Sequence, residues 1–144
     1  MKRFEKAVDD FNQGFNFSQS VLAAFAEEFG LNQEMARSVA AGFGGGMGRM
    51  GETCGAVSGA FMVIGLKYGP LQRPDKGSKE IIYSLINQFA EKFITQHQSL
   101  KCRELLGYDI SNPTEREKAR ANQVFTTICP KLVEDAVKIL EELL

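Results

Sequence analysis

Three cysteine residues are the side chains in this sequence best suited to covalent chemistry. Cys54, Cys102 and Cys129 are separated by 48 and 27 residues, spacings that no local metal motif requires, and the sequence contains no C-x-x-C pair. Cys54 falls in the first turn of a predicted helix, and Cys129 directly precedes Pro130, a typical first helical residue. Because the dipole and unpaired N–H groups of a helix start favour an anion, we expect a lowered pKa for both thiols.

A structural interpretation of the same cysteines stays open. Cysteine is among the most buried residue types and often only fills space in the core. Cys102 lies between Lys101 and Arg103, but adjacent residues on a helix point in different directions. Since the number of cysteines is odd, they cannot all pair within one chain.

The one histidine of the sequence, His97, lies five residues before Cys102 and near the end of a predicted long helix. As a fourth ligand beside the three thiolates, it would complete a tetrahedral zinc-type site. In the other interpretation, a histidine in the last turn of a helix complements the carbonyl end of the helix dipole. A hydrolase is not indicated, because His97 has no nucleophile and acid at a recognisable spacing.

A glycine-dense stretch from Gly42 to Gly51 should interrupt regular structure. Residues 46–51 fit the pattern G-x-G-x-x-G, but a helical stripe precedes them where a dinucleotide-binding fold needs a strand, and no Walker lysine follows. One interpretation is a backbone that needs positive φ or passes close to a neighbour. The other is a cradle for an anion or cofactor. The candidate binding residues of such a cradle are Gly44, Gly45, Gly46, Gly48 and Arg49.

A second glycine pattern follows, in which Gly51, Gly55 and Gly59 recur every four residues. On a helix these positions fall near one face and leave a groove that another backbone can approach. The groove predicts either tight packing of a core helix or the seam of a homodimer.

Apolar residues recur at helical period in almost every segment. The pattern predicts helices over residues 4–11, 21–29, 35–43, 53–69, 78–94 and 130–144, with shorter ones around 102 and from 113, and a loop over 70–77. Asn16, Asn32 and Asn112 are predicted helix caps, and Gly30 and Gly107 are predicted stops. No segment alternates cleanly at period two. We therefore predict an all-α, single-domain bundle of six to eight helices over residues 1–144, around a central Gly-rich helix.

Length and composition set further bounds. The 144 residues, 44% of them hydrophobic, suit one domain with a substantial core. A net charge of -1 argues against a nucleic-acid binder. The uncharged apolar run at residues 54–66 is too short to span a membrane, and the first residues lack the apolar stretch of a signal peptide. We therefore expect a cytoplasmic protein, a compartment in which thiols stay reduced.

The glycine and cysteine segments together resemble a known family. Residues 42–49 and 51–60 are similar to the core of the redox-active family named for its C_GCAxxG_C_C pattern, with Cys54-Gly55-Ala56-x-x-Gly59 as the signature. The segments around Cys102 and Cys129 resemble the third and fourth cysteine segments of that family. Residues 16–21 resemble the first segment, but Phe17 stands in place of its cysteine.

The resemblance implies thiol-based redox or metal-binding chemistry. In the redox form, Cys54 is the reactive thiolate, and Cys102 or Cys129 resolves it by disulfide formation. The cofactor is a thiolate-bound metal or none, and the sequence does not identify the electron donor or acceptor. The alternative, which Phe17 motivates, is a non-catalytic binding or assembly module with a degenerate cysteine site, buried unreactive thiols and a homo-oligomeric state.

Overall fold

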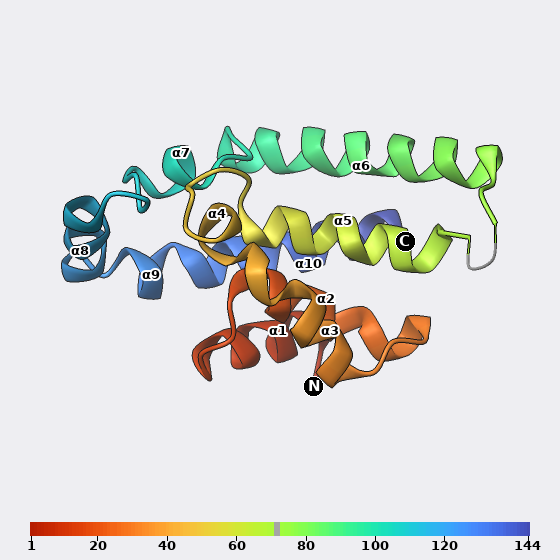
Figure 1. The fold of residues 1–144 in the computed structure, drawn as a ribbon, viewed down its shortest axis with the longest axis horizontal. Helices are drawn as coiled ribbons and strands as arrows, with labels where there is room; N and C mark the ends of the chain where they lie inside the picture. The colour runs from red at the N-terminus through yellow and green to blue at the C-terminus, as the bar shows by residue number, and fades with distance from the viewer. Residues whose placement is uncertain (71–72) are drawn as a thin grey trace.

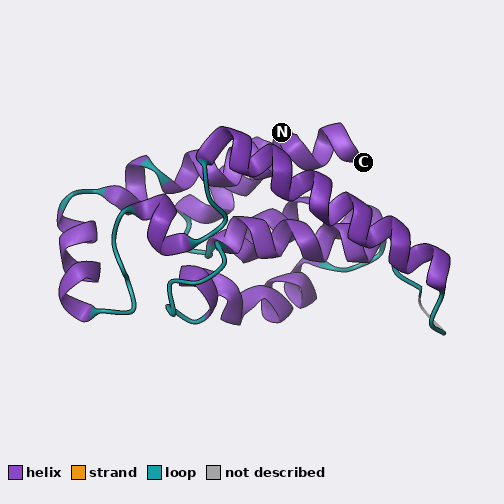
Figure 2. Cartoon of the chain, turned by 90° about the horizontal axis from the view of Figure 1, so that it is seen from above, coloured by secondary structure: helices purple, strands orange, loops and turns teal. Residues whose placement is uncertain are grey.

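A computed structural model describes residues 1–70 and 73–144, and Figures 1 and 2 show that its regular structure is helical throughout. Eight of the α-helices have five residues or more, which confirms the predicted helical bundle, and no strand occurs in the described ranges. The elements are α1(Arg3–Asn12), α2(Phe17–Ala26), η1(Glu27–Phe29), α3(Gln33–Ala40), η2(Ala41–Phe43), α4(Gly44–Met47), α5(Gly55–Tyr68), α6(Lys76–His97), α7(Cys102–Leu106), α8(Pro113–Ala121), α9(Val124–Thr127) and α10(Cys129–Leu143).

The glycine-rich helix α5 lies at the centre, as predicted. It contacts α2 on one side and α6 and α10 on the others, and Figure 1 shows it running between the long α6 and the layer of α1, α2 and α3. Its buried residues span Gly55–Ala60 and continue with Val63 and Ile64. A helix that is apolar nearly all round is stable only when neighbours cover every face. The largest fully buried side chains around it are Phe25, Phe89 and Phe93.

The glycine groove of α5 receives α2 of the same chain. A Cβ atom on Gly59 would lie 2.9 Å from the Ser18 carbonyl oxygen, and one on Gly55 would lie 3.1 Å from the Phe17 Cβ. The missing side chains therefore let two backbones pack tightly inside the core. Of the two predictions for the groove, core packing is confirmed for Gly55 and Gly59, whereas Gly51 lies before α5 and faces Asp109 and Arg103.

Several predicted helix ends are confirmed and others are wrong. Asn16, Asn32 and Asn112 each accept a backbone N–H in the following first turn, as predicted. The fourth predicted helix begins at Gly55, two residues after Thr53. The fifth begins at Lys76, capped by Asp75, so residues 76–77 are helical and not loop. Residues 71–72 of the predicted loop lie outside the described ranges.

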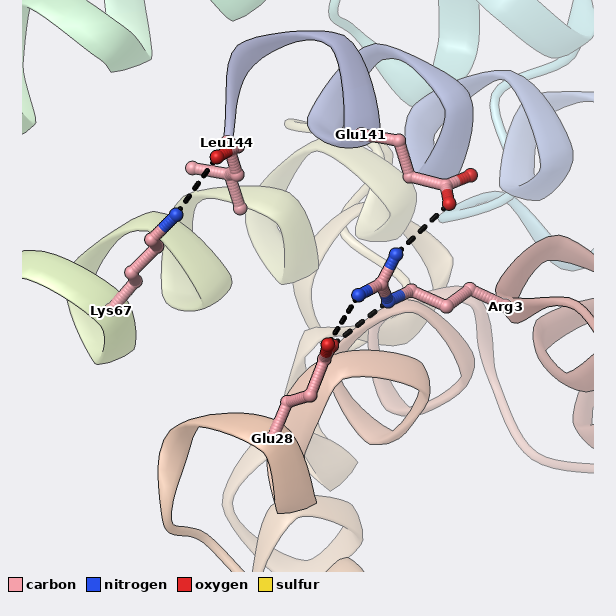
Figure 3. Close-up of polar contacts among 5 residues, drawn as sticks. All are labelled: Arg3, Glu28, Lys67, Glu141 and Leu144. Carbon is pink, nitrogen blue, oxygen red and sulfur yellow. Dashed lines mark hydrogen bonds and ion pairs between the residues drawn. The ribbon is translucent and has the colours of Figure 1, made fainter.

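Polar contacts fasten the two ends of the chain to the bundle (Figure 3). Arg3 in α1 donates to Glu28 of η1 and, at 3.0 Å, to Glu141 of α10. Lys67 near the end of α5 donates to the Leu144 backbone oxygen at 2.9 Å. These contacts join α1 to η1 and α10, and α5 to the last residue of the chain. Within the described residues, none of the helices is both long and apolar enough to cross a membrane.

Candidate functional site

A short backbone pairing brings two of the three cysteines together. Thr53 and Lys101 form an isolated antiparallel bridge. The N–H of Cys54 donates to the Leu100 carbonyl at 2.8 Å, and the N–H of Cys102 donates to the Glu52 carbonyl at 2.6 Å. Because side chains alternate along an extended segment, Cys54 and Cys102 lie on the same side of this small ladder.

Both cysteines of the ladder are buried. Cys54 is 2% exposed and Cys102 is 5% exposed, whereas Lys101 on the other side of the ladder is exposed. This pairing could not be predicted from the sequence, because a single bridge has no periodic pattern. It places the last residue before α5 beside the first residue of α7.

The glycine stretch forms a left-handed turn beside the cysteines. Five consecutive residues from Gly45 to Arg49 have positive φ, including the non-glycine residues Met47 and Arg49. L-residues avoid this conformation because Cβ approaches the following carbonyl, at a cost of roughly 1–2 kcal/mol per residue. Three of the five positions are glycine, which removes that cost. The prediction that this stretch needs positive φ and a close approach is confirmed.

The close approach is made to Cys102. A Cβ atom on Gly46 would lie 2.7 Å from the Cβ of Cys102 and 2.6 Å from the backbone nitrogen of Glu52. Arg103 holds the two residues that follow the turn, since its guanidinium donates to the carbonyls of Met50 and Gly51. The turn and α7 therefore fix one another.

A cavity of about 640 Å³ opens between the left-handed turn, the start of α2 and the segment α7–α9. Cys54 and Cys102 form part of its wall, and Phe17 lines it as well. All five residues of the predicted anion cradle also line it, namely Gly44, Gly45, Gly46, Gly48 and Arg49. The predicted cradle residues therefore form part of the cavity wall, and their role in binding stays a prediction.

The opposite wall escaped the sequence analysis. Arg116 and Arg120 lie four residues apart in α8, and Phe125 and Leu132 follow from α9 and α10. The i, i+4 spacing of the two arginines is a signal for a shared helix face. It did not reveal that this face turns toward the cysteines, because that depends on how α8 is placed.

Burial controls the acidity of the thiols, and the predicted lowering of their pKa is wrong. Burial raises the pKa of Cys54 to about 12, even though the backbone N–H groups of Ala56 and Val57 act to lower it. Burial also raises the pKa of Cys102, to about 11, against the lowering effect of the Arg103 charge. The removal of water destabilises the thiolate by more free energy than the helix start provides to stabilise it.

Cys129 lies apart from the cavity wall. It is fully buried in the core, and burial raises the pKa of its thiol above the ordinary range, with additional repulsion from Cys54 and Cys102. The predicted cap position is wrong, because Cys129 is the first residue of α10 and Ile128 before it already has helical backbone angles. Helices α9 and α10 therefore follow one another with no open helix start at this thiol.

His97 does not join the cysteines. Its Nε2 lies 2.9 Å from Asp135 Oδ2 of α10, and its ring packs against Phe93 at a centroid distance of 4.8 Å. No group of three or more His, Cys, Asp or Glu side chains in the described ranges is arranged to hold a metal ion. The ligand set of Cys54, Cys102, Cys129 and His97 therefore does not fit a metal centre in this structure. The histidine serves the contact between α6 and α10.

The phenylalanine at the place of the expected first cysteine is part of the site. Phe17 is the first residue of α2 and its Cβ approaches Gly55, the residue that follows Cys54. Its ring packs edge-on against Phe11 at a centroid distance of 4.9 Å. An aromatic surface therefore stands beside the two cavity thiols at this position.

Comparison with known proteins agrees with this arrangement of glycines and cysteines. Residues 15–143 match the family described as "Putative redox-active protein (C_GCAxxG_C_C)". The chain therefore belongs to this family, whose description is of redox activity. No curated protein and no solved structure gave a significant match.

Proposed function

We propose that this protein transfers electrons by thiol–disulfide exchange, with Cys54 and Cys102 as the redox pair. The observation that carries the proposal is their common placement. Two cysteines far apart in the sequence lie on one side of the Thr53–Lys101 bridge and in the wall of one cavity. Membership of a family described as redox-active supports the same reading.

The reaction takes two electrons from the protein and gives them to a small disulfide. The Cys102 thiolate attacks one sulfur of the disulfide, which breaks its S–S bond, forms a mixed disulfide and releases the first small thiol. The Cys54 thiolate then attacks the Cys102 sulfur and displaces the second small thiol. The two protons of the protein thiols leave with the two released thiols, and a Cys54–Cys102 disulfide remains.

The order of the two attacks follows from the acidity of the thiols. Burial raises the pKa of Cys102 to about 11, less than the value of about 12 for Cys54, because Cys102 is less completely removed from water and the charge of Arg103 also favours its thiolate. A thiolate is the attacking species in exchange. The proposal therefore gives the first attack to Cys102 and the resolving step to Cys54, the reverse of the roles expected from the sequence.

Raised pKa values make binding in the cavity part of the function. With a pKa of about 11, only about one Cys102 thiol in ten thousand is ionised at pH 7. A disulfide that meets the protein only by random collision should react slowly. A disulfide held in the cavity gains the high effective concentration of an intramolecular reaction. Phe17 then acts as a wall for the bound molecule, in place of a further thiol.

Mass spectrometry after oxidation tests the proposal. Reduced protein is treated with dithiodipyridine, a neutral aromatic disulfide, and its peptides are mapped. We expect the loss of two hydrogens and a peptide linked through Cys54 and Cys102. The Cys54→Ala variant should stop at a mixed disulfide on Cys102, and Cys102→Ala should react far more slowly. Cys129→Ala should still form the disulfide, with far-UV circular dichroism checking that each variant folds.

Other results would contradict the redox pair. A disulfide that requires Cys129, or equal labelling rates for all three thiols, would show that the cavity does not select the pair. Resistance of the native protein to oxidation would favour the second candidate, a binding module without thiol chemistry. That candidate has its own support in the burial and raised pKa of all three thiols.

A further inference from the structure

The charged side chains around the cavity are of one sign. The chain as a whole carries 17 basic and 18 acidic residues. Among the described residues that line the cavity, however, three are arginines, Arg49, Arg116 and Arg120, and none is an aspartate or glutamate. Low-dielectric walls strengthen the field of such a cluster, which raises the local concentration of anions.

Two of the three arginines keep their charge available to a ligand. The Arg49 side chain forms no hydrogen bond or ion pair with the described part of the chain, and a Cβ on Gly45 would lie 3.0 Å from its Cγ. The side chain therefore starts out over the left-handed turn. The Arg116 guanidinium donates only to the Ile110 carbonyl, at 3.4 Å. Arg120 differs, because its guanidinium pairs with Glu117 at 2.8 Å.

The rest of the lining is mostly apolar and aromatic. Phe11 and Phe17 form an edge-to-face pair on the α2 side, and Phe125 and Leu132 lie in the lining contributed by α9 and α10. A volume of about 640 Å³ lies within the usual range of about 300–1,000 Å³ for small-molecule sites. Aromatic walls with a few charged groups are typical of sites that bury an apolar body and fix one polar group.

We propose that the cavity binds a small organic anion, with an acidic group paired to Arg49 and Arg116 and an apolar or aromatic body against the phenylalanines. This anion site deepens the proposed function. Only the identity of the natural ligand, a disulfide presented to Cys54 and Cys102, rests on that function. Guanidinium groups favour carboxylate, sulfonate and phosphate groups because their planar fork matches those oxygens.

A pair of fluorescent probes tests the ligand class without any thiol chemistry. Anilinonaphthalene sulfonate carries an aromatic body and one anionic group, and phenylnaphthylamine has the same body without the charge. We expect the reduced protein to bind the sulfonate at one site per chain. Arg49→Gln and Arg116→Gln should each weaken that binding about tenfold, the loss of one charge-assisted hydrogen bond. Binding of the neutral probe should change by less than about twofold.

Arg73→Gln is the matched control, because Arg73 is exposed and does not line the cavity. It should leave the binding of both probes unchanged. The inference is overturned if the reduced protein does not bind the sulfonate, if the Arg49 and Arg116 variants bind it as tightly as the parent, or if both probes lose affinity equally. Neither probe contains a disulfide, so these results are independent of whether the thiols are redox-active.

A kinetic comparison then joins the inference to the redox pair. Dithiobis(nitrobenzoate) is an aromatic disulfide with carboxylates, and dithiodipyridine is a neutral one. In the Arg49→Gln/Arg116→Gln variant, the oxidation rate with the anionic disulfide should fall by about tenfold to a hundredfold, because the two arginines share one acidic group and their effects are not additive, while the rate with the neutral disulfide changes little. Equal loss with both disulfides would contradict the inference. If the probes bind as expected but neither disulfide oxidises the protein, the redox proposal fails and the anion site stands.

Discussion

The packing of the left-handed turn against Cys102 leads to a prediction for Gly46→Ala. At this position φ is +66°, and an added Cβ would lie 2.6 Å from the Glu52 nitrogen and 2.7 Å from the Cys102 Cβ. Left-handed backbone costs an L-residue roughly 1–2 kcal/mol. Forcing a methyl group into a filled site costs about 1–3 kcal/mol more. We expect the free energy of unfolding to fall by about 2–5 kcal/mol in total.

Two other glycines separate these contributions. Gly48 has a φ of +57°, but an added Cβ would meet only one atom, at 3.9 Å, so Gly48→Ala should show the backbone cost alone, about 1–2 kcal/mol. Gly65 lies inside α5 with nothing within 4 Å of an added Cβ and no positive φ. Gly65→Ala should therefore stabilise the protein, by about 0.5–1 kcal/mol.

Urea unfolding followed by far-UV circular dichroism measures all three variants on one scale. The order of stability should be Gly65→Ala, then the parent, then Gly48→Ala, then Gly46→Ala. If Gly46→Ala costs no more than Gly48→Ala, the turn does not pack against Cys102 as described. If Gly65→Ala is as damaging as Gly46→Ala, the whole argument from steric fit is wrong.

Three further predictions concern the core. The raised pKa of Cys54 keeps its proton on the folded chain while the unfolded chain ionises, so this thiol alone should lower stability by about 1.4 kcal/mol per pH unit between pH 9 and about 12. Cys102 and Cys129 add to the fall, and urea unfolding should show a shallower slope for Cys54→Ala. Ser18 Oγ is buried with no hydrogen-bond partner in the described ranges, whereas Ser20 Oγ donates to the Asn16 carbonyl at 2.8 Å. Ser18→Ala should therefore raise the free energy of unfolding by about 1–2 kcal/mol, whereas Ser20→Ala should lower it by about 0.5–1.5 kcal/mol. If both variants changed stability in the same direction, this explanation would be wrong. Asp135→Ala removes the partner of His97 and should lower the free energy of unfolding by about 1.5–3 kcal/mol in the same assay. The rate of thiol oxidation should stay unchanged. A slower oxidation would connect His97 to the thiols.

The helices and many of their ends could be predicted from sequence because their causes are local. Apolar spacing at period 3.6 identifies a buried face, and an asparagine such as Asn16 or Asn112 satisfies N–H groups only a few residues away. The start of α6 was wrong by two residues because Asp75 and Ser78 are both good caps, and Asp75 is the one whose carboxylate receives the Gly77 N–H. Local alternatives of similar energy are hard to rank from sequence.

The glycine stretch was determined by sequence only in part. Its glycines predicted positive φ and a close approach, and both are present. That the approach is made to Cys102 depends on the pairing of Thr53 with Lys101, a contact between segments 48 residues apart. No local pattern encodes such a contact.

Tertiary structure alone decided the chemistry of the thiols and the partner of the histidine. The sequence singled out all three cysteines as candidates, but the sign of their pKa shift depends on how much water the fold removes, and burial outweighs the helix start at Cys54. His97 meets Asp135 because α6 packs on α10, so the histidine is held away from the cysteines. Likewise, Arg116 and the glycine turn line the same cavity only because of where the fold places α8. Helix formation is a local balance, whereas burial, charge pairing and cavity shape depend on every segment that packs around a residue.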